Sequence, residues 1–148
     1  EVLIAMPALK LDAALIHVNR SDWRGNVQLF GADTYYDEWF AKAASKTYVS
    51  CEQLVDRIED HFPDDAQANT FERCFVTGVT EIPCGAHPSS MPPLYGPDMQ
   101  AFKAYAEAAR EPGDWSAVAD LFVGSDQDSY LSRMGGREAV MNIPLAIY

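Results

Sequence analysis

The chain contains 148 residues, of which 22 are acidic and 11 are basic, so its formal net charge at pH 7 is −11. With 48% hydrophobic and 22% charged residues, the composition is typical of a globular domain with a core and excludes a disordered chain. The negative charge argues against a duplex nucleic-acid partner, because the phosphates would repel the protein. No apolar run is long enough to span a membrane, and residues 1–6 lack the pattern of a secretory signal, so we expect a cytoplasmic protein.

The three cysteines, Cys51, Cys74 and Cys84, form no C-x-x-C pair. An odd number of cysteines in a cytoplasmic protein predicts reduced thiols, most of them buried. Cys84 and His87 have the spacing of two metal ligands, but prolines flank them and no second pair lies near in the sequence. We therefore predict no metal site.

The first third of the chain alternates between strand and helix patterns. The apolar run 13–18 is typical of a strand covered on both faces of a parallel sheet. A polar turn at 19–26 separates this run from a short strand at 27–30. A helix from about 36 to 45 and a strand at 47–51 follow. This order predicts an α/β fold with an open, mainly parallel sheet flanked by helices.

The helix expected near residue 36 carries an aromatic face. Tyr36, Trp39, Phe40 and Ala43 recur at the spacing of one helix face. Asp33 precedes them and is a suitable N-cap. We therefore predict that this face packs into the core.

The middle of the chain is polar and rich in proline. Residues 59–69 predict an acidic surface loop, and residues 75–82 predict another strand. The segment 83–97 contains five prolines and two glycines, which exclude a regular element there. Long ordered loops of this kind are often functional.

The last part of the chain is predicted to be helical. Asp98, Asp114 and Ser125 are placed to begin three helices, and Gly135-Gly136 ends the third. We expect residues 1–148 to form a single α/β domain or part of one.

His87 is the histidine best placed for binding, because it follows Gly85 and Ala86 just beyond a predicted strand. Loops at the ends of parallel strands tend to border the ligand crevice, and a glycine lets the backbone approach a ligand closely. The alternative, a rigid proline-rich loop packed onto the body with no ligand, is the interpretation that the spacing alone favours. His17 lies inside an apolar strand, which favours a hydrogen-bonded core residue, and His61 lies in the acidic loop.

The polar turn after the first strand has a structural interpretation. Gly25 supplies a positive φ there and Asp22 binds the turn backbone, in the pattern D-x-x-G-N that ends at Asn26. Arg20 and Arg24 are candidate anion contacts, although solvated surface is the favoured interpretation. The chain contains no phosphate-binding loop, no zinc-protease motif and no serine-hydrolase elbow.

Five segments in this order resemble the alpha subunit of the family I CoA-transferases of the glutaconate type, and also a related steroid ring-opening CoA hydrolase. They are 6–14, 17–26 with its D-x-x-G-N turn, 43–55 with its V-x-x-E-x-[IVL]-V passage, 85–88 with the sequence G-A-H-P, and 105–109. The resemblance implies an open α/β subunit of which this chain is the C-terminal half. It also implies that the N-terminal half, with its glycine-rich segment, is absent here.

The resemblance further implies how such an assembly works. In the transferases the acyl-CoA thioester is attacked by a glutamate of the beta subunit, so no residue of this chain is predicted to be catalytic; Glu52 and Glu81 are interpreted as structural. The implied partners are a beta subunit, the missing half and an acyl-CoA. Coenzyme A is a substrate carrier, and no cofactor is expected.

The resemblance implies that this chain forms one wall of the acyl pocket and part of a subunit interface. The predicted substrate-binding residues are Gly85, Ala86 and His87 at the pocket rim, with Asn19 and Asn26 near the strand ends. Three functions stay open: part of a CoA-transferase, part of a hydrolase that opens the ring of a steroid-derived CoA thioester, and a non-catalytic binding or scaffold subunit.

Overall fold

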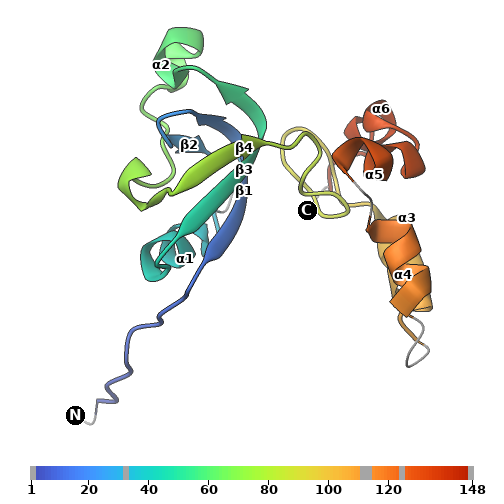
Figure 1. Ribbon diagram of the computed structural model, residues 1–148. Helices are drawn as coiled ribbons and strands as arrows, with labels where there is room; N and C mark the ends of the chain where they lie inside the picture. Colours follow the sequence, from blue (N-terminus) through green and yellow to red (C-terminus); the bar gives the residue numbers. More distant parts are fainter. Residues whose placement is uncertain (1–2, 32–33, 111–114, 124–125, 147–148) are drawn as a thin grey trace. The chain divides into compact units, whose positions relative to one another are not determined.

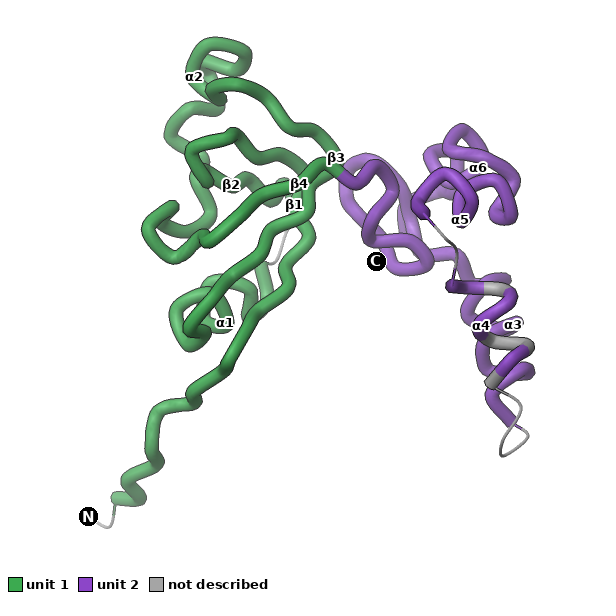
Figure 2. The backbone as a smooth tube through the Cα atoms, viewed as in Figure 1, with its two compact units in different colours: residues 1–81 green, residues 82–148 purple. Residues whose placement is uncertain are grey.

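The computed structural model describes residues 3–31, 34–110, 115–123 and 126–146 (Figure 1). The chain, which we expected to form one domain or part of one, divides into two compact units (Figure 2). The first unit comprises residues 1–81 and the second comprises residues 82–148.

The first unit is built on a four-stranded sheet with the strand order β2-β1-β3-β4 (Figure 1). The strands are β1 (Ala14–Asp22), β2 (Val27–Gln28), β3 (Thr47–Val55) and β4 (Gly78–Glu81). β3 runs parallel to both β1 and β4, whereas the short β2 pairs antiparallel with the end of β1. The mainly parallel sheet confirms the predicted fold class.

The hydrophobic core of the first unit lies on one face of this sheet. Alternate residues of β1 and β3 point to it, among them Ile16, Val18 and Val49. Helix α1 (Asp37–Ala43) and the long connection after β3 contribute Ala41 and Phe71 to the same cluster. The chain moves across the sheet in one direction, from β1 to β3 and then to β4. Because connections between parallel strands are right-handed, the β1–β3 and β3–β4 connections lie on the same face of the sheet.

The prediction that the aromatic face of α1 packs into the core is wrong. Tyr36, Trp39 and Phe40 are exposed, Trp39 by 63%, whereas Ala41 is completely buried. The small side chain lets the helix approach the sheet closely, and the Thr47 hydroxyl donates to the Ala41 carbonyl. The predicted N-cap, Asp33, lies outside the described residues.

The connection between β3 and β4 contains short helical turns where the sequence predicted only a loop. They are α2 (Ile58–His61), η1 (Pro63–Asp65) and η2 (Arg73–Phe75). None exceeds four residues, so no hydrophobic periodicity could develop in the sequence.

In its described residues, the second unit contains the proline-rich segment and four helices. The helices are α3 (Met99–Ala108), α4 (Trp115–Phe122), α5 (Gln127–Arg133) and α6 (Arg137–Met141). Three of them were predicted, and α6 was missed. In the part of the chain that the structure describes, no helix has the length and apolar character needed to cross a membrane.

The ends of these helices show which predicted caps are used. Asp98 caps α3 by accepting hydrogen bonds from the backbone N–H groups of Gln100 and Ala101. Asp126 caps α5, while the predicted caps Asp114 and Ser125 lie outside the described residues. As predicted, Gly135 and Gly136 stop α5: they follow its C-cap, Met134, with φ angles of 87° and 94°.

Candidate functional site

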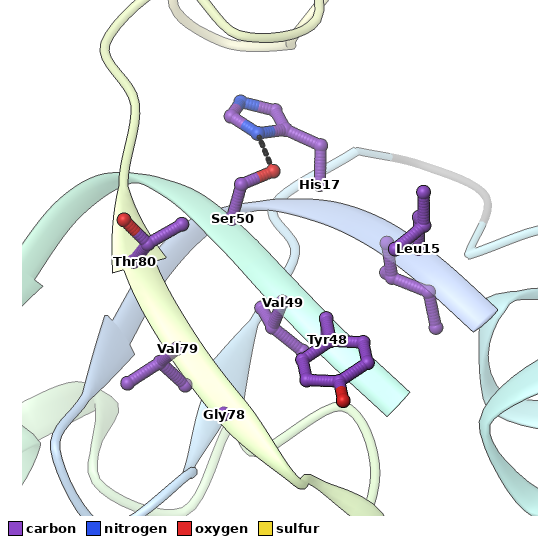
Figure 3. A pocket seen from close by; sticks show the side chains of 9 residues that line it. Leu15, His17, Tyr48, Val49, Ser50, Gly78, Val79 and Thr80 are labelled. Atoms are coloured by element: carbon purple, nitrogen blue, oxygen red, sulfur yellow. Dashed lines mark hydrogen bonds between the residues drawn. The ribbon is translucent and has the colours of Figure 1, made fainter. Parts of the chain in front are cut away.

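A shallow groove crosses the face of the sheet opposite the core (Figure 3). Its volume is about 440 Å³, and its walls are three consecutive residues from each parallel strand: 15–17, 48–50 and 78–80. The strand register aligns His17 with Ser50 and Ser50 with Thr80 across the floor. The groove therefore collects side chains that come from three separate segments of the sequence.

His17 occupies the centre of a hydrogen-bonded row on this face. Its Nε2 lies 2.9 Å from Oε1 of Glu52, and its Nδ1 lies 2.8 Å from Oγ of Ser50 (Figure 3). A carboxylate only accepts hydrogen bonds, so Nε2 carries the proton. In the neutral imidazole Nδ1 then accepts from the Ser50 hydroxyl. The prediction that His17 is hydrogen-bonded is confirmed, but the prediction that it lies in the core is wrong, because its side chain is partly exposed and lines the groove.

Serine, histidine and glutamate are also the components of a hydrolytic triad. A serine nucleophile needs N–H groups aimed at the developing oxyanion. Ser50 lies in the middle of β3 between two parallel neighbours, where the backbone N–H groups serve the sheet ladders. The row is therefore a positioning network on a sheet face rather than a nucleophilic site.

The buried carboxylate of Asp22 organises the turn after β1. Its Oδ1 accepts from the backbone N–H groups of Arg24 and Asn26 at 3.0 Å, and its Oδ2 accepts from Nδ2 of Asn26 at 2.8 Å. Oδ2 also lies 3.4 Å from the backbone nitrogen of Ile58. Gly25 has a φ of 86°. The structural interpretation of the D-x-x-G-N motif is confirmed.

Asn19 and Asn26, both predicted near a ligand, have structural partners. Oδ1 of Asn19 accepts from the backbone N–H of Phe30 at 2.8 Å, and Nδ2 of Asn26 donates to Asp22. The groove is lined by other residues. The amide groups of Asn19 and Asn26 thus hold the chain around the end of β1.

Arg20 differs from the predicted solvated surface residue. Its guanidinium lies 3.3 Å from the ring centroid of Phe62 and donates to Gln28 at 3.0 Å and to Asp65 at 3.3 Å. Only 12% of its side chain is exposed. Stacking and hydrogen bonding therefore fix Arg20 inside the first unit, whereas the Arg24 side chain is exposed as expected.

In the second unit, His87 is the centre of a buried polar cluster. Its Nε2 lies 3.1 Å from Oδ2 of Asp98, and its Nδ1 lies 2.5 Å from the hydroxyl of Tyr130. The side chain has no exposed surface. Because Nε2 donates to the carboxylate, Nδ1 accepts from the Tyr130 hydroxyl. His87 therefore joins the proline-rich segment to the N-cap of α3 and to the middle of α5.

The neighbours of His87 form tight turns at the surface. Gly85 is exposed and its N–H donates to the Ile82 carbonyl at 3.0 Å. The residue with a positive φ is Cys84, at 57°, rather than Gly85. The N–H of Ala86 donates to the hydroxyl of Tyr95, a completely buried residue. Of the three residues Gly85, Ala86 and His87, Gly85 and part of Ala86 are thus accessible to solvent.

The cluster shifts two pKa values in opposite directions. Burial, helped by the charge of Asp98, raises the pKa of Tyr130 to about 12, so its hydroxyl stays a donor at neutral pH. Burial alone would raise the pKa of the Asp98 carboxyl. The N–H groups of Ala101 and Gln100 and the ring of His87 outweigh burial and lower the pKa of Asp98 below its ordinary value.

We predict that the second unit loses stability in acid through Asp98. A carboxyl whose pKa is lowered by folding stabilises the protein above its unfolded pKa, here 3.8, and this contribution disappears as the pH falls through the lower folded value. The difference in melting temperature between pH 7 and about pH 3 should therefore be smaller in Asp98→Asn than in the parent chain. The exposed Asp120→Asn is the control, and an unchanged difference in Asp98→Asn would contradict the prediction.

We predict that one of the three cysteines reacts readily in the folded protein. Cys51 and Cys84 are buried, whereas Cys74 is exposed. Burial, followed by the charge of Glu81, raises the pKa of the Cys51 thiol to about 12, and the thiolate is the reactive form. Brief treatment with a maleimide should add a single label, which peptide mapping places on Cys74. Faster labelling of Cys51 would show that its thiol is accessible and would contradict the prediction.

The two glutamates that match the family pattern hold the sheet together. Glu52 binds His17, and Oε1 of Glu81 accepts from the backbone N–H of Leu54 at 2.9 Å. Among the residues that could be described, no group of three or more His, Cys, Asp or Glu side chains is arranged to hold a metal ion.

Comparison with known proteins identifies homologous subunits. No protein-family model matches the chain. It is 39% identical over 130 residues to the cholesterol ring-cleaving hydrolase IpdA subunit of Rhodococcus jostii strain RHA1, a match that covers 88% of this chain and 44% of that protein. It is 29% identical over 142 residues to the alpha subunit of glutaconate CoA-transferase from Acidaminococcus fermentans, over 95% of this chain and 43% of that protein.

The fold agrees with these matches. The crystal structure of glutaconate coenzyme A-transferase from A. fermentans superimposes with a TM-score of 0.81 and 28% identity, over 93% of this chain and 43% of that chain. The chain spans less than half the length of these relatives. By sequence and by fold, it is a homologue of the family I CoA-transferase alpha subunits, a group that here includes both the glutaconate CoA-transferase and the ring-cleaving hydrolase.

Proposed function

We propose that the chain is part of the alpha subunit of a heteromeric CoA-transferase that moves CoA between carboxylic acids. The observation that carries this proposal is the combined sequence and structural match to glutaconate CoA-transferase over at least 93% of the chain. Another relative, the alpha subunit of 3-oxoadipate CoA-transferase from Pseudomonas knackmussii, is 28% identical over 130 residues. The proposed partners are a beta subunit, the rest of the alpha subunit and an acyl-CoA.

In the proposed reaction, the nucleophile is a glutamate of the beta subunit. Its carboxylate attacks the thioester carbonyl and expels the CoA thiolate, which gives a mixed anhydride. The thiolate then attacks the glutamyl carbonyl and releases the first acid. The acceptor acid repeats these two steps in reverse and leaves with CoA. This proposal is consistent with the positions of Glu52 and Glu81, whose carboxylates hold protein groups.

The proposed contribution of this chain is to border the acyl pocket through the proline-rich loop. Gly85 is exposed and has no side chain that would keep an acyl group at a distance. Ala86 is partly exposed, while buried His87 supports the loop from behind. Coenzyme A is a substrate carrier in this proposal, and no further cofactor takes part.

The test uses the chain assembled with a beta subunit and with the rest of the alpha subunit. The complex is incubated with glutaconyl-CoA and an isotopically labelled short-chain carboxylic acid, and the CoA esters are followed by mass spectrometry. We expect the label to appear in a new CoA ester. Release of free CoA without labelled ester would contradict transfer, and tight binding of the CoA ester without turnover would indicate a non-catalytic subunit.

A second candidate is a hydrolase subunit that opens the ring of a steroid-derived CoA thioester. The 39% identity to the cholesterol ring-cleaving hydrolase favours it, because the identity to glutaconate CoA-transferase is 29%. The same complex is then given a cyclic steroid-derived CoA ester without an acceptor acid. Hydrolysis of the ring adds the mass of one water and keeps the CoA attached, whereas an unchanged mass counts against this candidate.

A further inference from the structure

Helix α1 (Figure 1) and the turn before it carry a cluster of exposed aromatic residues, Tyr35, Tyr36, Trp39 and Phe40, which we call the aromatic patch. These residues are exposed by 78%, 66%, 63% and 42%. The rings of Tyr36 and Phe40 have centroids 6.2 Å apart. At 3.6 residues per turn, the part of the patch on the helix lies opposite the buried Ala41. Large exposed apolar surfaces of this kind mark interaction sites.

The polar rim of the aromatic patch is acidic. At one edge, the ammonium group of Lys42 binds Glu38 and lies 3.6 Å from Oε2 of Glu72, so its charge is neutralised within the chain. At the other edge, Asp37 follows Tyr36 and is half-buried. Burial raises the pKa of the Asp37 carboxyl, because a partly desolvated carboxylate is less stable without a nearby cation. The rim therefore favours a positively charged group at Asp37.

The layers of the fold indicate which polypeptide covers the patch. An α/β domain packs its helices directly on the faces of its sheet. α1 and the connection between β3 and β4 contribute to the core on one face, and the patch lies on the side of α1 that faces away from this core. This chain thus already occupies the core face of the sheet. A polypeptide that covers the outer side of α1 therefore comes from a neighbouring subunit.

The charge of the chain indicates what this neighbour presents. A second copy would bring another formal charge of −11 and the same acidic rim, so like charges would face one another. An arginine fits the patch better, because its planar guanidinium stacks on aromatic rings and forms paired hydrogen bonds with a carboxylate. Tryptophan, tyrosine and arginine are also the residues that contribute most to binding at protein interfaces.

The aromatic patch is large enough to form the centre of a stable interface. A fully covered aromatic side chain buries about 150–250 Å², so the exposed parts of the four rings offer about 500 Å². One partner of a standard interface contributes about 800 Å². The patch therefore supplies more than half of that area, and the polar residues around it supply the remainder.

We propose that the aromatic patch is a docking surface for the beta subunit, and that an arginine of that subunit stacks on the patch and pairs with the Asp37 carboxylate. This inference rests on the proposed function, because it takes the chain to work together with a beta subunit. It goes further by naming the surface that is covered and the charged group that the partner presents.

The first test measures the affinity between the full alpha subunit that contains this chain and its beta subunit. Trp39→Ala should weaken the association by about tenfold or more, because truncating a covered tryptophan at an interface has a large effect. Trp23→Ala is the matched control, since Trp23 is 64% exposed and lies between β1 and β2, outside the patch. Its affinity should stay that of the parent. Equal affinities for the two variants overturn the proposal.

The second test examines the charge of Asp37. Asp37→Asn keeps the size of the side chain and removes its charge, and it should weaken the association by about tenfold, since hydrogen bonds to charged groups are the stronger ones. The exposed Asp64→Asn is the control and should leave the affinity unchanged. An affinity of Asp37→Asn equal to that of Asp64→Asn overturns the pairing.

The third test identifies the partner group. A photo-crosslinking phenylalanine derivative replaces Tyr36 and is activated in the complex, and the joined peptides are identified by mass spectrometry. A beta-subunit peptide that contains an arginine supports the proposal. A beta-subunit peptide without arginine overturns it, and so does a peptide from a second copy, from the rest of the alpha subunit or from residues 82–148 of this chain.

The CoA-transfer assay separates this inference from the proposed function. A complex that transfers CoA, but in which Trp39→Ala binds the beta subunit as the parent does, refutes the docking surface and not the proposed function. A complex in which Trp39→Ala weakens the association, but which releases free CoA and never transfers it, refutes the proposed transfer and supports the docking surface.

Discussion

Replacing Asp22 by alanine is expected to lower the free energy of unfolding of the first unit by about 3 kcal/mol. The carboxylate is completely buried and accepts hydrogen bonds from Arg24, both nitrogens of Asn26, and Ile58. Alanine leaves these donors without their acceptor inside the protein, where an unpaired polar group costs about 1–3 kcal/mol. Urea unfolding followed by circular dichroism measures the difference.

The exposed Asp64→Ala is the matched control for this change, because it removes the same charge without removing a buried acceptor. Its unfolding midpoint should stay that of the parent chain. Asp22→Asn should be less damaging than alanine, since one amide oxygen still accepts. A midpoint for Asp22→Ala equal to that of Asp64→Ala would show that the turn does not depend on the carboxylate.

Replacing His87 by alanine is expected to lower the free energy of unfolding of the second unit by about 3 kcal/mol. The change leaves a cavity and removes the imidazole that binds the Tyr130 hydroxyl and one Asp98 oxygen, and leaves the hydroxyl only its longer hydrogen bond to the carbonyl of residue 87. Tyr130→Phe, which removes a single hydroxyl, should cost about 1 kcal/mol. Thermal unfolding of the parent chain and the two variants gives this order directly.

Kinetic measurements on the assembled complex show whether His87 only supports the loop or contacts the ligand directly. A residue that supports a loop from behind changes stability, whereas a residue that binds the acyl group changes KM. At a temperature where His87→Ala is folded, we expect its KM for the acyl-CoA to match that of the parent complex. A large rise in KM with unchanged stability would instead assign His87 to the pocket.

Several local features of the fold could be predicted from the sequence. The apolar run that became β1, the D-x-x-G-N turn around Asp22, the cap at Asp98 and the end of α5 at Gly135 each depend on residues that are neighbours in the chain. Caps, tight turns and strand runs act over a few residues. Their signals are therefore present in the sequence before any tertiary contact forms.

The buried face of α1 illustrates where such reasoning fails. The helical spacing of Tyr36, Trp39 and Phe40 is real, yet the helix turns Ala41 toward the sheet. Periodicity shows that a helix has an apolar face, but the space above the sheet decides which face packs. A close approach of helix to sheet favoured the small residue here.

The α/β class, the order of the main elements and the resemblance to the CoA-transferase alpha subunits were all accessible from the residues in chain order. The partners of the two histidines emerge only in the folded chain. His17 meets residues 33 and 35 positions away, and His87 meets Tyr130 at a separation of 43. The strand register and the packing of the helix ends bring these groups together. No local pattern encodes such pairings, because the groups become neighbours only once the chain has folded.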